Sequence, residues 1–125
     1  MRPIVVMILL ALVSTGCSSN TTSSDSGIVG QVFLGPTCPV ETPGIDCADK
    51  PYRATLTVLT SSNKRVTSFE TDQDGNFRIN LLPGDYVLHP EMPPGQLLPF
   101  ATDQAFIVQT GHFTILEVDY DTGIR

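Results

Sequence analysis

Two segments decide the fold: Thr71-Asp72-Gln73-Asp74-Gly75-Asn76-Phe77 and Leu82-Pro83-Gly84-Asp85-Tyr86-Val87-Leu88. Each contains a chain reversal, because Asp-Gly readily adopts the positive φ of a tight turn and Pro-Gly is a comparable turn signal. Apolar residues then alternate with polar ones, as in a half-buried strand. The pattern predicts two successive β-hairpins, with Phe77 packed inward beside Tyr86.

Similar short runs occur on both sides of these segments, between clusters of turn residues. None has the i, i+3, i+4, i+7 apolar spacing of a long helix. Seven strands are therefore predicted, at residues 28–34, 54–60, 66–71, 76–81, 85–89, 106–109 and 113–120. This succession is typical of an all-β, seven-stranded antiparallel β-sandwich.

The two segments also resemble the T-D-x-x-G-x-F and L-x-P-G-x-Y-x-L signature of carboxypeptidase regulatory-like domains. These domains belong to the transthyretin-like (prealbumin-like) superfamily, so the resemblance, over residues 27–122, implies a transthyretin-like sandwich. We accordingly expect the domain to occupy residues 27–125. More narrowly, residues 35–40, Cys47, residues 51–52 and residues 120–125 resemble a family of small bacterial lipoproteins or secreted proteins. That resemblance implies no particular activity.

The N-terminus has the pattern of an export signal. An apolar run at residues 4–13 follows Arg2 and precedes a polar tract. The run is too short to span a bilayer, which needs about 20 residues, and fits a signal peptide over residues 1–16. The stretch ending at Cys17 resembles a bacterial lipobox, which implies acylation of Cys17. Ser14 stands where Leu is usual, so ordinary secretion of a soluble protein is the alternative.

The remaining segments define how the mature chain would be displayed. Residues 17–26 are mostly Ser and Thr, a composition typical of a flexible linker. Ser18 follows Cys17, where an Asp would favour the inner membrane, so the outer membrane is expected if the organism has one. Cys38 and Cys47 are predicted to form a disulfide bond, because thiol pairs normally close in an oxidising compartment.

Charge and length exclude several classes of function. The chain has 125 residues, with 7 Lys and Arg against 13 Asp and Glu, for a net charge of −6. Loss of Arg2 with the leader leaves a net charge of −7. Such a chain is too short for a multi-domain enzyme, and it lacks the basic residues that binding of nucleic acid requires.

No complete catalytic set is present, so we expect a protein that is not an enzyme and needs no cofactor. The chain has two His residues and no Gly-x-Ser-x-Gly nucleophile motif. A small secreted hydrolase or carbohydrate-active enzyme is the alternative. Acidic side chains converging in a cleft near Tyr52 or His89 would favour it.

Asp72, Asp74 and Asn76 imitate the first ligands of a calcium-binding loop. A full loop needs a bidentate Glu at its twelfth position, where this chain has Pro83. A turn without metal is therefore the main interpretation. A weak calcium site, and with it a calcium-dependent adhesion module, is the alternative.

These observations predict a non-catalytic lipoprotein of the cell envelope that serves as a binding or structural accessory module. It would be held to the membrane through Cys17 and bind an envelope protein or a glycan. Met92, Leu97 and Leu98, in a segment containing four prolines, are the candidate partner surface together with the loop between Cys38 and Cys47. Alternatively, these apolar residues cover an open end of the sandwich.

Overall fold

The computed structural model describes residues 25–40 and 43–124. This part of the chain contains strands and loops but no helix, as the sequence predicts. Accordingly, no helix in the described residues has the length and apolar character needed to cross a membrane. Eight strands are present: β1 (Gly27–Gly35), β2 (Lys50–Pro51), β3 (Thr55–Thr60), β4 (Arg65–Glu70), β5 (Asn76–Asn80), β6 (Gly84–Pro90), β7 (Gln104–Val108) and β8 (Phe113–Asp121).

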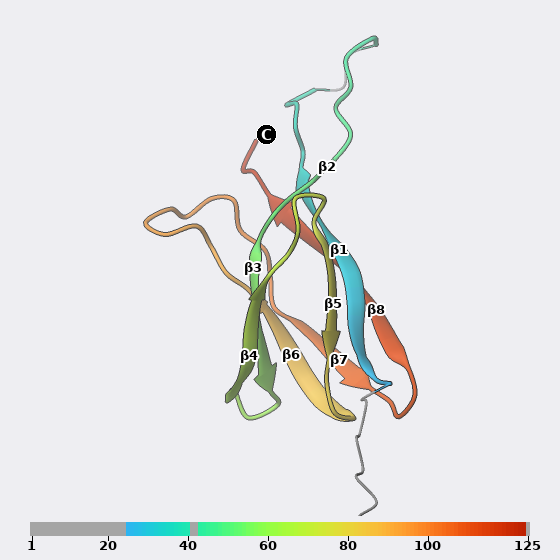
Figure 1. Ribbon diagram of the computed structural model, residues 1–125. Helices are drawn as coiled ribbons and strands as arrows, with labels where there is room; N and C mark the ends of the chain where they lie inside the picture. Colours follow the sequence, from blue (N-terminus) through green and yellow to red (C-terminus); the bar gives the residue numbers. More distant parts are fainter. Residues whose placement is uncertain (1–24, 41–42, 125) are drawn as a thin grey trace, which may run out of the picture.

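The strands form two four-stranded sheets that pack as a β-sandwich (Figure 1). In the first sheet, β1 pairs with β5 and with the short β2 on one side and with β8 on the other. The second sheet has the order β4-β3-β6-β7. All pairs are antiparallel except β1 with β8, which is parallel over nine residues.

The core lies between the two sheets and comes from the alternation seen in the sequence. Leu56 and Val58 of β3 face Leu116 and Val118 of β8 across a layer in which apolar side chains of both sheets are buried. Phe77 is also buried and contacts the ring of Phe69 at a centroid distance of 5.6 Å. Burial of this layer provides the main driving force for folding. The remaining buried apolar residues are Ile28, Val32, Ala54, Leu81, Leu88, Phe106, Val108 and Tyr120.

Two details of the predicted sandwich are corrected in the described residues. There are eight strands rather than seven, because the two-residue β2 pairs with Phe33 and Leu34. The sheets are not purely antiparallel, since the first and last long strands run side by side in the same direction. Ser26, at the end of the expected linker, is buried, and its hydroxyl donates to the Leu81 carbonyl at 2.7 Å.

The two predicted hairpins are instead crossings between the sheets. The turn at residues 72–75 joins β4 of the second sheet to β5 of the first, and Pro83 precedes the return to β6 in the second sheet. Tyr86 consequently stacks on Phe106, at a centroid distance of 5.6 Å, rather than lying beside Phe77. Turn residues fix where a chain reverses, but the wider packing decides which strand each arm pairs with.

The first crossing is fastened to β1. Asp72 Oδ1 accepts the N–H groups of Asp74 and Asn76, at 2.9 and 2.8 Å, and the Gly75 carbonyl accepts the Val32 N–H at 2.9 Å. Gly75 has φ 75°, and a Cβ there would lie 2.3 Å from the Val32 carbonyl oxygen. Only glycine satisfies both the conformation and the close approach.

The two ends of the sandwich differ. The chain enters β1 beside the β7–β8 turn, where the Gly27 N–H donates to the His112 carbonyl at 3.2 Å. The long loops after β1 and β6 and the segment after β8 project from the other end (Figure 1). An N-terminal linker therefore joins the domain at the end opposite these loops.

Candidate functional site

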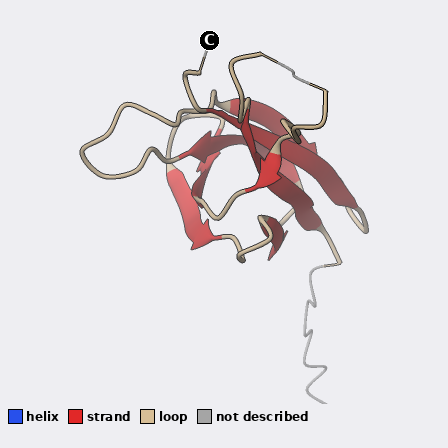
Figure 2. Cartoon of the chain, turned by 90° about the horizontal axis from the view of Figure 1, so that it is seen from above, coloured by secondary structure: helices blue, strands red, loops and turns tan. Residues whose placement is uncertain are grey.

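The loop-bearing end of the domain contains three segments, which we call the disulfide loop (residues 36–49), the proline-rich loop (residues 91–103) and the C-terminal segment (residues 121–124). Seen from above, the disulfide loop and the proline-rich loop project in different directions, and the C-terminal segment lies between them (Figure 2). The candidate partner surface predicted from the sequence is thus located at one end of the molecule.

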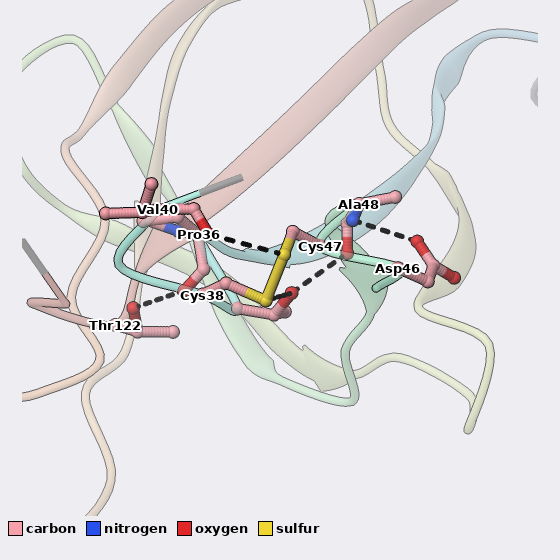
Figure 3. The surroundings of a disulfide bond; sticks show 8 residues. Pro36, Cys38, Val40, Asp46, Cys47, Ala48 and Thr122 are labelled. Carbon is pink, nitrogen blue, oxygen red and sulfur yellow. Dashed lines mark hydrogen bonds between the residues drawn. A yellow bond between two sulfur atoms is a disulfide. The ribbon is translucent and has the colours of Figure 1, made fainter. Parts of the chain in front are cut away.

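The disulfide loop is closed by the predicted bond between Cys38 and Cys47, whose Cα atoms lie 5.3 Å apart (Figure 3). Within the loop, the Ala48 N–H donates to Asp46 Oδ1 at 3.0 Å. At its base, the Pro36 carbonyl accepts the Thr122 hydroxyl at 2.7 Å. These contacts attach the loop to the end of β8.

The C-terminal segment also holds the proline-rich loop. The N–H and carbonyl groups of Asp121 bond to those of Phe100 at 2.7 and 3.1 Å. A Cβ on Gly123 would lie 2.5 Å from the Leu98 side chain, so Leu98 packs closely against this segment. The two loops therefore share one support at the end of β8, although they are 50 or so residues apart in sequence.

The three apolar residues of the predicted partner surface have different surroundings. Leu97 is 84% exposed, whereas Met92 and Leu98 are about half exposed, at 49% and 44%. Met92 lines a pocket of about 200 Å³ whose other residues include Arg53, Glu70 and Glu91. Leu98 thus helps to cover the end of the sandwich, while Leu97 is presented to solvent.

A contact between His89 and two acidic side chains at the base of the proline-rich loop was missed from the sequence. His89 Nδ1 lies 2.6 Å from Asp103 Oδ1, and His89 Nε2 lies 3.8 Å from Glu91 Oε2. Glu91 Oε1 also accepts the Thr57 hydroxyl at 2.8 Å. Because Glu91 and Asp103 are the two ends of the loop, His89 holds its base together. The acids on either side of the prolines are the one sequence signal that could have indicated this contact.

Acidic side chains therefore do converge near His89 and near Tyr52. Among the described residues, the Thr57 hydroxyl donates to the Glu91 carboxylate and the Tyr120 hydroxyl donates to the Glu91 carbonyl. The Glu70 carboxylate in the neighbouring pocket is paired with Arg53. The contacts of Thr57 and His89 attach the base of the proline-rich loop to β3 and β6, and the alternative of a small hydrolase or carbohydrate-active enzyme stays a prediction.

Tyr120 connects the core to the proline-rich loop. Its ring is 1% exposed and contacts Tyr52 edge-on at a centroid distance of 5.1 Å, while its hydroxyl donates to the Glu91 carbonyl at 2.7 Å. Burial, with smaller contributions from Tyr52 and Glu91, raises the pKa of Tyr120 well above its usual value of 10.0. The neutral phenol is therefore the form that the folded protein stabilises.

This raised pKa predicts a loss of stability at alkaline pH. Below pH 10.0 the phenol is neutral in both states, and above it the unfolded state loses the proton first. We expect the free energy of unfolding to decrease by about 1.4 kcal/mol per pH unit above that value. Urea unfolding at a series of pH values would measure this decrease.

Tyr120→Phe should lower the stability at neutral pH by about 1–2 kcal/mol, through loss of the hydrogen bond to Glu91, and should remove this part of the alkaline decrease. Tyr86→Phe is the matched control, because it loses a similar bond, to the Leu82 carbonyl at 2.6 Å, but keeps Tyr120. An unchanged alkaline slope in Tyr120→Phe would contradict the assignment.

Of the calcium candidates, Asp72 and Asp74 lie on the crossing turn and Asn76 is the first residue of β5. One oxygen of Asp72 is already the acceptor for two backbone N–H groups. No group of three or more potential His, Cys, Asp or Glu metal ligands occurs in the described part of the chain. Calcium binding by Asp72, Asp74 and Asn76 stays a prediction. Cys17 and the signal peptide lie outside the described residues.

Comparison with known proteins provides a likeness in fold. No family model and no curated protein matches the chain. Among solved structures, the chain is similar to part of the Bacillus anthracis TIE protein, with 18% sequence identity and a TM-score of 0.53. The match covers 78% of this chain and 17% of that one, so the present chain spans about a sixth of the length of the protein it resembles.

Proposed function

We propose that the chain is a non-catalytic lipoprotein of the cell envelope, attached through Cys17, whose β-sandwich presents the disulfide and proline-rich loops to an envelope protein or glycan. We further propose that the sandwich is transthyretin-like and related to carboxypeptidase regulatory-like domains. Thr71 and Asp72, two residues of that signature, have structural roles consistent with this relationship. The Thr71 hydroxyl accepts the Ala54 N–H at 3.0 Å, and Asp72 caps the turn.

The proposal rests on one observation: the N-terminal linker and the long loops lie at opposite ends of the domain. The linker enters beside His112, and the loops project from the opposite end (Figure 1). On a lipid-anchored chain, this arrangement would direct Leu97 and the disulfide loop away from the membrane. The net charge of −7 expected for the mature chain would also keep the domain off an anionic lipid surface.

The loop-bearing end has the features of a binding surface rather than of a flexible tail. A disulfide bond, the Phe100–Asp121 bridge and the His89 contacts restrain the bases of its loops. Restraint of a loop before binding reduces the conformational entropy lost when a partner is bound. An exposed Leu97 on a restrained loop would supply the apolar contact.

Metabolic labelling with a palmitate analogue tests the anchor. Two or more acyl chains give stable membrane attachment, so we expect the wild-type chain to carry the label and to sediment with membranes. Cys17→Ala should abolish both properties. The double variant Cys38→Ser/Cys47→Ser is the matched control and should keep the label. An unlabelled wild-type chain would overturn the lipoprotein assignment and leave ordinary secretion.

A further inference from the structure

The last strand leaves one edge of the first sheet unpaired. On one side β8 pairs with β1. Away from β1, within the described residues, the Asp121 backbone is bridged to Phe100 and the Thr114 hydroxyl donates to the Ile107 carbonyl of β7 at 2.5 Å. The N–H and carbonyl groups of successive residues in a strand point to alternate sides. The backbone groups of Ile115, Glu117 and Asp119 therefore point to the same side as those of Asp121. In the described part of the chain, the backbone groups of these three residues form no hydrogen bond on the side away from β1.

Acidic side chains border this open edge. A cleft of about 300 Å³ runs between β8 and residues 101–104, and its walls include Asp103, Glu117 and Asp119. Lys and Arg are absent from the described residues that line it. Arg78, the basic residue on the outer face of the same sheet, lies over the Phe113 ring at 3.7 Å and is thus engaged near the start of β8.

An apolar groove adjoins the same edge on the outer face of the sheet. It has a volume of about 460 Å³ and is lined by Val29, Phe33 and Ile115, among others. Ile115 is 82% exposed. A strand added to β8 would direct alternate side chains over this groove, so an apolar residue opposite Ile115 would be partly buried.

We propose that the open edge of β8 binds an extended, cationic segment of another protein by strand addition. Backbone N–H and carbonyl groups of Ile115, Glu117 and Asp119 would pair with the segment, and its Lys or Arg side chains would lie against Asp103, Glu117 and Asp119. Main-chain bonds provide affinity in this mode of recognition, and side chains provide specificity. A second copy of this chain is disfavoured as the occupant, because two β8 edges would bring like charges together. The site shares Asp103 with the base of the proline-rich loop, but its backbone groups belong to β8, and it does not depend on the lipid anchor.

Binding of a designed peptide tests the proposal on the full-length chain. The probe is a fluorescent peptide of lysine and valine, equal in length to β8, that places valine opposite Ile115 and lysine opposite Glu117 and Asp119. Its anisotropy reports binding. We expect saturable binding that weakens as salt is added, together with slower hydrogen exchange at the amides of Ile115, Glu117 and Asp119. A glutamate-valine peptide should bind at least about tenfold more weakly.

Three variants separate the edge from general attraction by an acidic protein. Glu117→Pro removes an N–H on the open side without removing a bond to β1. It should bind about tenfold or more weakly than Glu117→Gln, which also lacks the carboxylate but keeps the N–H. Asp85→Lys, on an exposed position of β6, should leave the affinity within about twofold of wild type. The same peptide with all its backbone amides N-methylated has equal charge but no N–H donors, and should bind as weakly as the glutamate control.

Several results would overturn the proposal. Equal binding of the N-methylated and unmodified peptides would mean that charge alone attracts them. Equal affinity of Glu117→Gln and Glu117→Pro would exclude the edge. A wild-type dimer that Glu117→Pro converts to a monomer would assign the edge to a second copy. Because none of these readouts involves Cys17, Leu97 or the disulfide loop, their failure and the failure of the proposed envelope function can be distinguished.

Discussion

Gly75→Ala is expected to destabilise the domain by about 2–5 kcal/mol. Two effects add at this position. A left-handed conformation costs a residue with a Cβ about 1–2 kcal/mol, and Gly75 has φ 75°. In addition, the new Cβ would lie 2.3 Å from the Val32 carbonyl oxygen, and relief of such overlap in a packed site typically costs about 1–3 kcal/mol. Urea unfolding followed by circular dichroism would measure the difference.

Gly95→Ala is the matched control for this prediction. Gly95 has φ 72°, but a Cβ there would meet no atom within 4 Å. This variant should lose only the conformational contribution, about 1–2 kcal/mol. Equal destabilisation by the two substitutions would contradict the close packing of the crossing turn on β1.

Loss of the disulfide bond is the second large effect that we predict. Replacement of both Cys38 and Cys47 by serine should lower the free energy of unfolding by about 2.5–3 kcal/mol, because the unfolded chain regains the entropy that the closed loop removes. The loss should appear as a lower urea midpoint. The fold itself should persist, since the core lies between the sheets and not in the disulfide loop.

Reduction of the wild-type protein should reproduce the effect of the double variant, and the same reductant should leave the double variant unchanged. A loss below about 1 kcal/mol in both experiments would mean that the bond barely restrains the unfolded chain. The disulfide bond would then no longer count as one of the three restraints proposed for the loop-bearing end.

The sequence predicts the strands and their buried faces well because both depend on local alternation. Leu56 and Val58, and likewise Leu116 and Val118, alternate with more polar residues in the sequence and are buried in the structure. The predicted bond between Cys38 and Cys47 is confirmed. The turns are also positioned correctly along the chain, at Asp72–Gly75 and at Pro83.

Pairing between distant strands is where the prediction was wrong. Turn residues indicated hairpins, but β5 pairs with β1 and β6 with β3, because the apolar faces are best buried when the chain alternates between the sheets. No pattern in the nearby sequence indicates the parallel pairing of β1 with β8, since the paired residues are more than 80 positions apart. The contacts of His89 with Glu91 and Asp103 likewise depend on the closure of the proline-rich loop.

Photocrosslinking in intact cells tests the central claim, that the loop-bearing end of a tethered domain engages an envelope partner. A photoreactive residue at Leu97 is compared with one at Gln109, which is exposed on the β7–β8 turn at the opposite end. We predict a discrete crosslinked product from Leu97, none from Gln109, and loss of the Leu97 product when Cys17→Ala removes the anchor. Equal products from both positions, or none above background from Leu97, would contradict the account.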